Sequence, residues 1–248
     1  MDHISIVADT LFHIGPLPVT NTMLTAWIVS LGFIIFAFII SRRVSYIPSK
    51  LQNFAEAVIE IIIGFLETIA GDRKTAERFF PIVATIFLFV LASNWLGILP
   101  GVGSIGMHTV GHDGHEAFVP LFRSVYSDLN MTLALALIVV VLSHVYGLIT
   151  VGVRHHLGKF ITFKGPVLFF TGILEIIGEL SKVISLSFRL FGNVFAGEVL
   201  LIIIGSLVPY IATIPFLGLE LFVGLIQAAI FGVLAMVAFS SFTRADSH

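Results

Sequence analysis

The sequence predicts an all-α integral membrane protein that forms one membrane domain over residues 1–248. Of its 248 residues, 57% are hydrophobic and only 11% are charged, whereas soluble domains average about 25% charged residues. Five apolar runs are each long enough to cross a bilayer, which takes about 20 residues. Basic residues gather in two of the segments that connect these runs, as expected for the cytoplasmic loops of a multi-pass protein.

The predicted membrane helices are the apolar runs bounded by charged residues or prolines. They cover residues 22–41, 79–99, 131–153, 167–207 and 215–243. As a helix, the fourth run would be about 60 Å long, roughly twice the thickness of the hydrocarbon core. Because no proline interrupts it, we expect a strongly tilted helix that forms a hairpin with the long fifth helix.

Residues 50–71 predict a helix of a different kind, amphipathic and lying on the cytoplasmic membrane surface. Glu56, Glu60 and Glu67 fall on one helical face, and apolar residues fill the rest. The polar face is acidic rather than basic. An acidic face can bind a protein partner or can simply be solvated, and the sequence supports the two interpretations about equally.

The placement of basic residues predicts the orientation. Six lie between the first two spans and three between the third and fourth, whereas Arg123 is the one arginine in the 100–130 connection, against three acidic residues. The positive-inside rule then puts the N-terminus outside, in the periplasm, and the C-terminus in the cytoplasm. No basic residue precedes Arg42, so a cleaved signal or a transit peptide is not expected. A bacterial plasma (inner) membrane is therefore favoured, although an organelle-encoded protein would also lack a transit peptide.

Six charged side chains lie within the last two apolar runs, where each central charge costs about 2.5–3.5 kcal/mol on insertion scales. They are Glu175, Glu179, Lys182, Arg189, Glu198 and Glu220. Charges in such positions usually pair with one another, face water or take part in transport. Helical periodicity gathers a polar stripe within about 80° of arc, formed by Glu175, Lys182, Ser185, Arg189 and Asn193. Glu198 points to the opposite face, about 13 Å further along the helix than Arg189.

The two residue types differ in what they can do with a proton. A buried glutamate can bind and release one, whereas an arginine stays charged because its pKa is above about 12. Arg189 would thus act as a fixed cation that repels protons and attracts carboxylates. Protonatable groups interrupted by such a cation indicate two half-paths separated by a barrier.

Structural roles are the alternative for each of these residues. Arg189 could form an ion pair with a glutamate. Glu175, Glu179 and Lys182 could satisfy one another near the interface, a reading as well supported as a functional one. Asn193 and Gln227, taken singly, are typical of hydrogen bonds between helices.

The motif RLFGNVFAGE (Arg189–Glu198), followed by GLIQAAIFGVLAMVAFS (Gly224–Ser240), resembles subunit a of the rotary F-type ATP synthase. The resemblance covers the whole chain and includes ASNWLGILPG at Ala92–Gly101. It implies a stator whose last two helices pack against a ring of c subunits, each with one carboxylate at mid-membrane. Protons would enter by one half-channel, ride the ring and leave by the other. Further partners would be b-type peripheral stalk subunits and, indirectly, a catalytic ATPase head.

The resemblance also implies roles for residues. Arg189 would face the ring carboxylate, keep it deprotonated and block a leak. Asn193 and Gln227 match polar positions near that arginine, and Ser185 matches one on the cytoplasmic side. The transported ion would be H⁺, although Na⁺-driven relatives share much of this pattern.

Glu198 and Glu220 match positions of the outer half-channel, where some family members have a glutamate and a histidine. Here both are glutamates. Two close carboxylates cannot both ionise cheaply, so we expect a coupled acidic pair. Which of the two carries the proton stays open at this point.

Other functions are less well supported by the sequence. There is no GxxxxGK[ST] motif for nucleotide phosphates, so we expect no catalytic site and no cofactor in this chain. The formal net charge of −2, with no basic patch, argues against nucleic acid as a partner. A proton-coupled secondary transporter is the main alternative, but such folds commonly have repeated halves and broken helices, which this sequence lacks.

An intramembrane metalloenzyme is a further alternative, because histidines cluster at spacings that can bind zinc. We expect His144, in the third span, to be a packed helix residue. The remaining candidates fall in loops on opposite sides of the predicted membrane and cannot form one site, so we expect no metal; they are His108, His112, His115 and Glu116 outside, and His155 and His156 inside.

Overall fold

The computed structural model describes residues 8–42, 44–99, 101–102, 105–110, 116–160, 165–208 and 213–243. Within them, five helices are long and apolar enough to cross a membrane. This confirms the predicted all-α membrane fold. The helices are α1 (Asn21–Ser41), α2 (Lys50–Ala70), α3 (Arg73–Ile98), α4 (Leu129–Val151), α5 (Val153–Phe160), α6 (Pro166–Leu207) and α7 (Thr213–Thr243).

Two helix ends differ from the sequence-based expectation. Helix α3 starts at Arg73 rather than at residue 79, because the Asp72 side chain caps it by accepting a hydrogen bond from the backbone N–H of Thr75 (2.8 Å). Helix α4 ends at Val151, since Gly152 adopts a φ of 90° that leaves the helix. The chain then forms the short helix α5, which the sequence did not predict.

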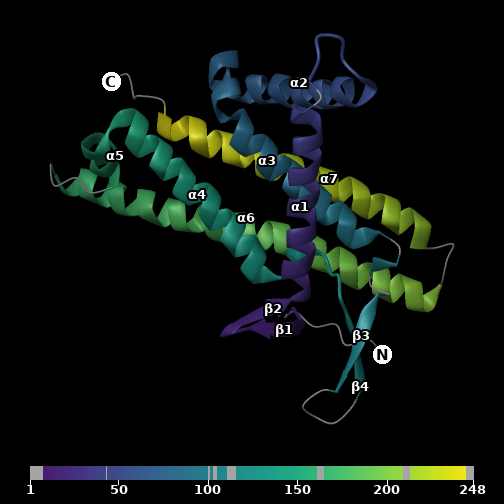
Figure 1. The fold of residues 1–248 in the computed structure, drawn as a ribbon. Coiled ribbons are helices and arrows are strands. Elements are labelled where there is room, and N and C mark those ends of the chain that lie inside the picture. The colour runs from purple at the N-terminus through teal and green to yellow at the C-terminus, as the bar shows by residue number, and fades with distance from the viewer. Residues whose placement is uncertain are drawn as a thin grey trace.

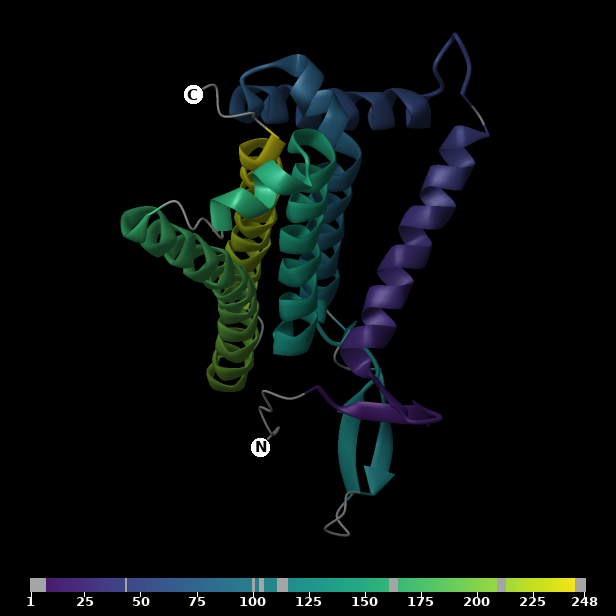
Figure 2. The same ribbon diagram turned by 90° about the vertical axis from the view of Figure 1, so that its left-hand side faces the viewer.

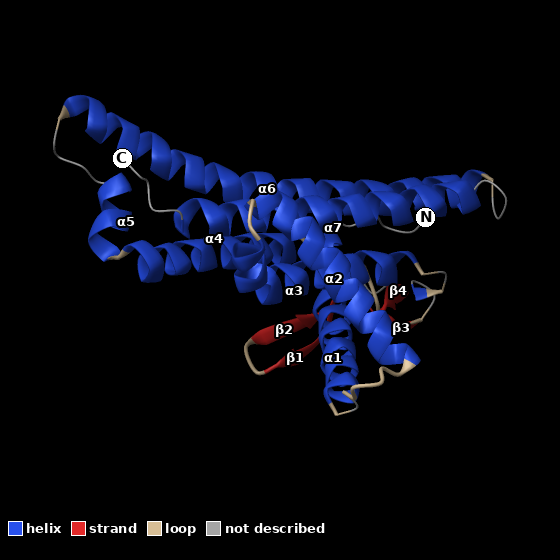
Figure 3. Cartoon of the chain, turned by 90° about the horizontal axis from the view of Figure 1, so that it is seen from above, coloured by secondary structure: helices blue, strands red, loops and turns tan. Residues whose placement is uncertain are grey.

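Helix α6 runs for 42 residues without a break. Together with α7 it crosses α1 obliquely (Figure 1). The second half of α6 lies beside α7 in both views, while its first half diverges from α7 (Figures 2 and 3). The long tilted hairpin expected from the sequence is therefore the arrangement found.

The core lies between α3, α4, α6 and α7. Phe79 of α3 stacks on Phe239 of α7 (ring centroids 5.6 Å apart) and meets the edge of Tyr146 of α4 (5.3 Å). Small residues let the helices approach closely, as is usual for helices packed in membranes. Those that are fully buried are Ala76, Ala136, Ala228 and Ala235.

Helix α2 lies across the end of the bundle (Figure 2). Its acidic face is partly paired: Arg73, at the start of α3, donates to both carboxylate oxygens of Glu60 (2.9 and 3.2 Å) and to Glu77 (2.8 Å). The hydrogen bonds and charge of Arg73 lower the pKa of Glu60 below its usual value. These groups are exposed, so the pairs orient α2 more than they stabilise the fold.

Two small β-hairpins lie at the opposite end of the bundle from α2 (Figures 1 and 2). One is formed by β1 (Thr10–Ile14) and β2 (Leu17–Thr20), the other by β3 (Gly106–Val110) and β4 (Glu116–Pro120). The sequence did not predict them. A 3₁₀ turn, η2 (Val125–Ser127), follows the second hairpin and is buried.

Helix α1 stands apart from the other spans over much of its length (Figure 2). Its buried residues all lie in its first half: Asn21, Thr22, Thr25, Ala26 and Val29. This end of α1 contacts the hairpins and η2. It therefore anchors the segment that carries Arg123.

Candidate functional site

The polar stripe of α6 lies on the exposed side of the helix, and only Asn193 at its end also reaches α7 among the contacts described. Helix α6 buries Gly172, Glu179, Val183, Leu186, Ser187 and Leu190, a set with helical spacing on one side. The residues of the stripe, Glu175, Lys182, Ser185, Arg189 and Asn193, are all exposed. Large apolar side chains flank Arg189 on the open side, with Ile184 and Phe188 about half exposed.

Arg189 has a polar neighbour one turn earlier on the same helix. Its Nη2 donates to the Ser185 hydroxyl (3.3 Å). Within the part of the chain that the structure describes, no carboxylate forms an ion pair with Arg189. The structural ion pair considered as the alternative is therefore not found among these residues.

A hydrogen bond joins α6 to α7 next to Arg189. The Asn193 side-chain amide donates to Oε1 of Gln227 (2.7 Å), and Gln227 is buried. Two residues 34 positions apart, both expected near the arginine, thus meet one turn beyond it. Their bond fixes the register of the two long helices at this level.

Glu220 and Glu198 are brought together where α7 crosses α6 further along. The Glu220 carboxylate lies directly against Gly197, so closely that a Cβ at this position would collide with it. Glu198 is the next residue. Both glutamates are half-buried, and the predicted acidic pair is a neighbouring pair in the structure.

The prediction for this crossing is that Gly197→Ala impairs transport more than assembly. The added methyl would displace the carboxylate of Glu220, a flexible side-chain end, while alanine suits the helix. We expect proton flux to fall by roughly tenfold, because small misplacements of a functional group have effects of this order or larger. Passive flux through the membrane sector and yield of the assembled complex would be measured together.

The control is Gly205→Ala, since nothing lies within 4 Å of a Cβ built at Gly205. Equal flux in the two alanine variants would contradict the idea that Gly197 makes room for Glu220.

Helix α3 holds α7 in place beside Glu220. Trp95 Nε1 donates to the Leu221 carbonyl (3.1 Å), and the Asn94 amide donates to the Gly224 carbonyl (3.3 Å). Both donors come from the ASNWLGILPG motif. The motif thus positions the backbone that carries Glu220.

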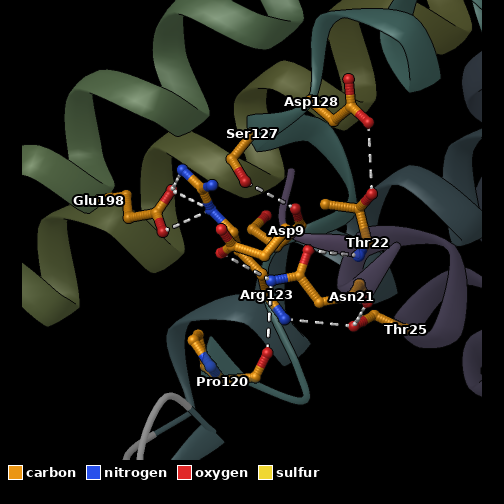
Figure 4. Close-up of polar contacts among 10 residues, drawn as sticks. Asp9, Asn21, Thr22, Thr25, Pro120, Arg123, Ser127, Asp128 and Glu198 are labelled. Carbon is orange, nitrogen blue, oxygen red and sulfur yellow. Dashed lines mark hydrogen bonds and ion pairs between the residues drawn. The ribbon is translucent and has the colours of Figure 1, made fainter. Parts of the chain in front are cut away.

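Glu198 forms an ion pair that sequence reasoning missed. Arg123 Nε lies 3.0 Å from Oε1 and 3.4 Å from Oε2 of Glu198, and its Nη2 lies 3.3 Å from Oε2 (Figure 4). The Arg123 side chain is only 8% exposed, against 28% for Glu198. The two residues are 75 positions apart, and no pattern in the sequence relates them.

A polar network ties the segment around Arg123 to the start of α1 (Figure 4). The Arg123 backbone N–H donates to the Thr25 hydroxyl (3.3 Å), and the Asn21 amide donates to the Pro120 carbonyl (3.3 Å). Thr22 donates to Asp128 (3.4 Å), the residue that caps α4. The start of α1 therefore holds the chain both before Arg123, at Pro120, and after it, at Asp128.

Buried polar atoms without partners gather between α3 and η2. Of the five buried side-chain atoms without a hydrogen-bond partner in the described residues, four lie here: Ser93 Oγ, Asn94 Oδ1, Ser124 Oγ and Tyr126 OH. They are neighbours, because Ser124 packs on Gly97 and the ring of Tyr126 meets the edge of Phe89 (6.4 Å). Burial raises the pKa of the Tyr126 hydroxyl, which therefore stays a donor. The interior of the protein next to Asn94 and Glu220 therefore contains polar atoms.

At the other end of α6, Glu179 turns into the protein instead of following the stripe. It is 9% exposed and binds Lys182 Nζ (2.5 Å). Its second oxygen lies 3.6 Å from His144 Nε2. The pairing of Glu179 with Lys182 is the structural alternative named above, whereas Glu175 is exposed.

His144 and His156 also meet at this end, which the sequence did not suggest. His144 Nδ1 lies 3.1 Å from His156 Nε2, and His156 is buried although it was expected in a loop. His112 and His115 lie outside the described residues, as do the side chains of His108 and Glu116. In the described part of the chain, no three potential ligands group around a possible metal position.

Comparison with known proteins agrees with the resemblance. The family model "ATP synthase A chain" matches residues 23–240. The ATP synthase subunit a of Moorella thermoacetica is 31% identical over 234 residues, which cover 94% of this chain and 95% of the relative. That of Citrifermentans bemidjiense is 34% identical over 221 residues (88% and 85%), and that of Campylobacter jejuni 34% over 229 residues (91% and 86%). This chain therefore belongs to the family of ATP synthase a subunits, non-catalytic multi-pass proteins of the membrane sector through which that complex moves protons.

Proposed function

We propose that this chain is the stator of the proton motor, with two offset half-channels that deliver protons to and from the carboxylates of a c-ring. Arg189 is the barrier between the half-channels and the cation that faces the ring. The observation that carries the proposal is its position: a permanent cation on a membrane helix, flanked by large apolar side chains, on a face that this chain leaves uncovered.

An arginine at that depth needs an anion. Charged groups in membrane segments nearly always pair or face water, and guanidinium cannot neutralise itself by losing its proton. No carboxylate within the described residues forms an ion pair with Arg189. A carboxylate on a neighbouring ring, passing in front of α6, would supply the missing charge and be held ionised by it.

The outer half-channel leads to Glu220 and Glu198. Its support is the group of buried polar atoms on Ser93, Asn94, Ser124 and Tyr126. Buried polar groups without protein partners are usually bonded by water. A hydrated route past these atoms reaches the crossing at Gly197, where Glu220 lies between α6 and α7.

The cytoplasmic half-channel follows the exposed stripe of α6 from Arg189 through Ser185 and Lys182 to Glu175. Its residues lie on the same open face as Arg189, so protons that leave the ring would pass along the contact between ring and helix. In this proposal Glu179 is a structural partner of Lys182 rather than part of the path.

The proposed setting is a bacterial inner membrane, with the N-terminus in the periplasm and the C-terminus in the cytoplasm. The concentration of basic residues around α2 supports this orientation. The c-ring covers the open face of α6, and b-type stalk subunits hold the chain against it. The ATPase head is coupled only indirectly.

The test is to purify the chain in mild detergent from its native membrane. We expect it to come with a c-ring and a soluble ATPase, and vesicles that contain this complex should acidify when ATP is added. A chain that purifies alone and takes up a solute with protons would instead support the secondary transporter.

A further inference from the structure

Beyond the proposed function, on which this inference rests, the ion pair at the outer end of α6 divides the work of the two glutamates. We propose that Arg123 is a positioning residue that holds Glu198 as a charge-compensated anion, so that Glu220 alone carries the proton of the outer half-channel.

The first argument is the asymmetry of the two carboxylates. Both oxygens of Glu198 lie within 3.4 Å of Arg123 nitrogen atoms, a two-oxygen contact that guanidinium geometry favours. Glu220 forms no hydrogen bond and no ion pair within the described residues. Two neighbouring acids with such different surroundings are suited to different roles.

The second argument is that Arg123 is built into the fold. Its side chain is 8% exposed, its backbone N–H is bonded to Thr25, and the following residues, Val125 and Tyr126, are almost fully buried. A surface arginine would pair with Glu198 only part of the time. This one is held within reach by α1, α3 and α4, and a buried guanidinium in turn requires an anion.

The third argument concerns how charge acts on Glu220. Its carboxylate lies against Gly197, next to Glu198 in the chain. Glu198 without its arginine would be a second bare carboxylate beside the one that must bind and release a proton. With Arg123 in place the pair is neutral as a whole, so Glu220 exchanges protons without an uncompensated charge beside it.

The charged groups that surround Glu198 among the described residues are few. Arg123 comes from the segment before η2, and Glu220 comes from α7. Asp9 and Asp128 belong to the same network, but they bind Asn21 and Thr22 of α1 (Figure 4). Arg123 and Glu220 are thus the two charged side chains that we test together with Glu198.

The experiment compares Arg123→Gln, Glu198→Gln and the double variant in the complete ATP synthase. Inverted vesicles are stripped of the ATPase head and loaded at a series of internal pH values, because their lumen corresponds to the outer side. A potassium diffusion potential then drives protons out through the membrane sector, and the initial flux is recorded against lumen pH.

We expect Arg123→Gln to lower the flux by about tenfold and to shift its pH profile, since it leaves a buried charge uncompensated. Adding Glu198→Gln should restore the flux to within about threefold of the wild type and bring the pH profile back, because replacing both partners of a buried pair is often nearly neutral. Arg123→Lys should keep more flux than Arg123→Gln. Arg42→Gln, at an exposed arginine outside the site, is the matched control and should match the wild type.

Two results would overturn the inference. If the double variant is as poor as Arg123→Gln, Arg123 acts independently of Glu198. If the double variant stops flux as completely as Glu220→Gln, Glu198 itself carries protons, because no unpaired charge of this pair remains in that variant. Retention of the c-ring and of ATP hydrolysis before stripping shows that each variant is assembled. A failure of this inference leaves the proposed function intact, because that function is tested separately by purification with a c-ring and by ATP-driven acidification.

Discussion

Replacing Arg189 with alanine should abolish ATP-driven acidification of inverted vesicles while the complex still assembles. In the proposed function, Arg189 is the cation that holds a passing ring carboxylate ionised, and the alanine variant lacks it. The barrier also falls: at an effective dielectric constant of about 20, a proton 5 Å from a fixed positive charge is repelled by roughly 3 kcal/mol. Its loss should raise the passive leak by about two orders of magnitude.

The measurement is quenching of a pH-sensitive dye, first with ATP and then with a diffusion potential alone. Arg189→Lys is the informative comparison. It keeps a positive charge, so its leak should stay low, but it lacks the planar fork that suits a carboxylate. Arg42→Ala should behave as the wild type. Normal pumping in Arg189→Ala would mean that this arginine is structural and that the proposed barrier is wrong.

Glu220→Gln should have the second largest effect. Glutamine has nearly the same shape, so the contact with Gly197 can be kept, but it cannot bind and release a proton. We expect both ATP-driven pumping and passive flux to fall by at least about tenfold, the usual contribution of a positioned acid or base being about 10² or more. Unlike the arginine variant, this one should not leak, because Arg189 remains.

Glu77→Gln provides a matched control. Glu77 is exposed, pairs with Arg73 and has no part in the proposed proton path. Flux would be compared at equal amounts of assembled complex. Unchanged pumping in Glu220→Gln would show that the acidic pair is not needed for proton uptake and that the outer half-channel runs elsewhere.

The helices could be predicted from the sequence because apolar length is nearly sufficient to define a membrane span. The uninterrupted α6 followed from the absence of proline, and the exposed stripe around Arg189 followed from helical periodicity. The ends were less certain: the cap at Asp72 and the turn at Gly152 depend on single residues. The β-hairpins were missed because each strand has only four or five residues and no clear alternation.

The site was predictable only along one helix at a time. Arg189, Ser185 and Asn193 lie on one face, and periodicity relates them directly. Arg123 and Glu198 meet through the packing of two distant segments, which periodicity cannot reveal. The same holds for His144 and His156, which meet only because Gly152 ends α4 and turns α5 back.

Glu179 shows a further limit of the pattern. It lies one turn from Glu175 on α6, at the edge of the polar stripe, and could have faced either way. The contact between α6 and α4 determines the direction of the side chain. Glu179 is buried near His144, while Glu175 remains exposed. Which side a borderline residue takes depends on the neighbouring helix, not on the helix that carries it.

The uncovered face of α6 has a consequence for biogenesis. A newly inserted chain without its ring would present Arg189 to lipid, at a cost of about 2.5–3.5 kcal/mol for a central charge. In the proposed function a ring carboxylate pairs with Arg189 and removes that penalty, so assembly would stabilise the inserted chain. A chain that has not met a ring would keep this cost, so we expect it to be less stable in the membrane than the assembled chain.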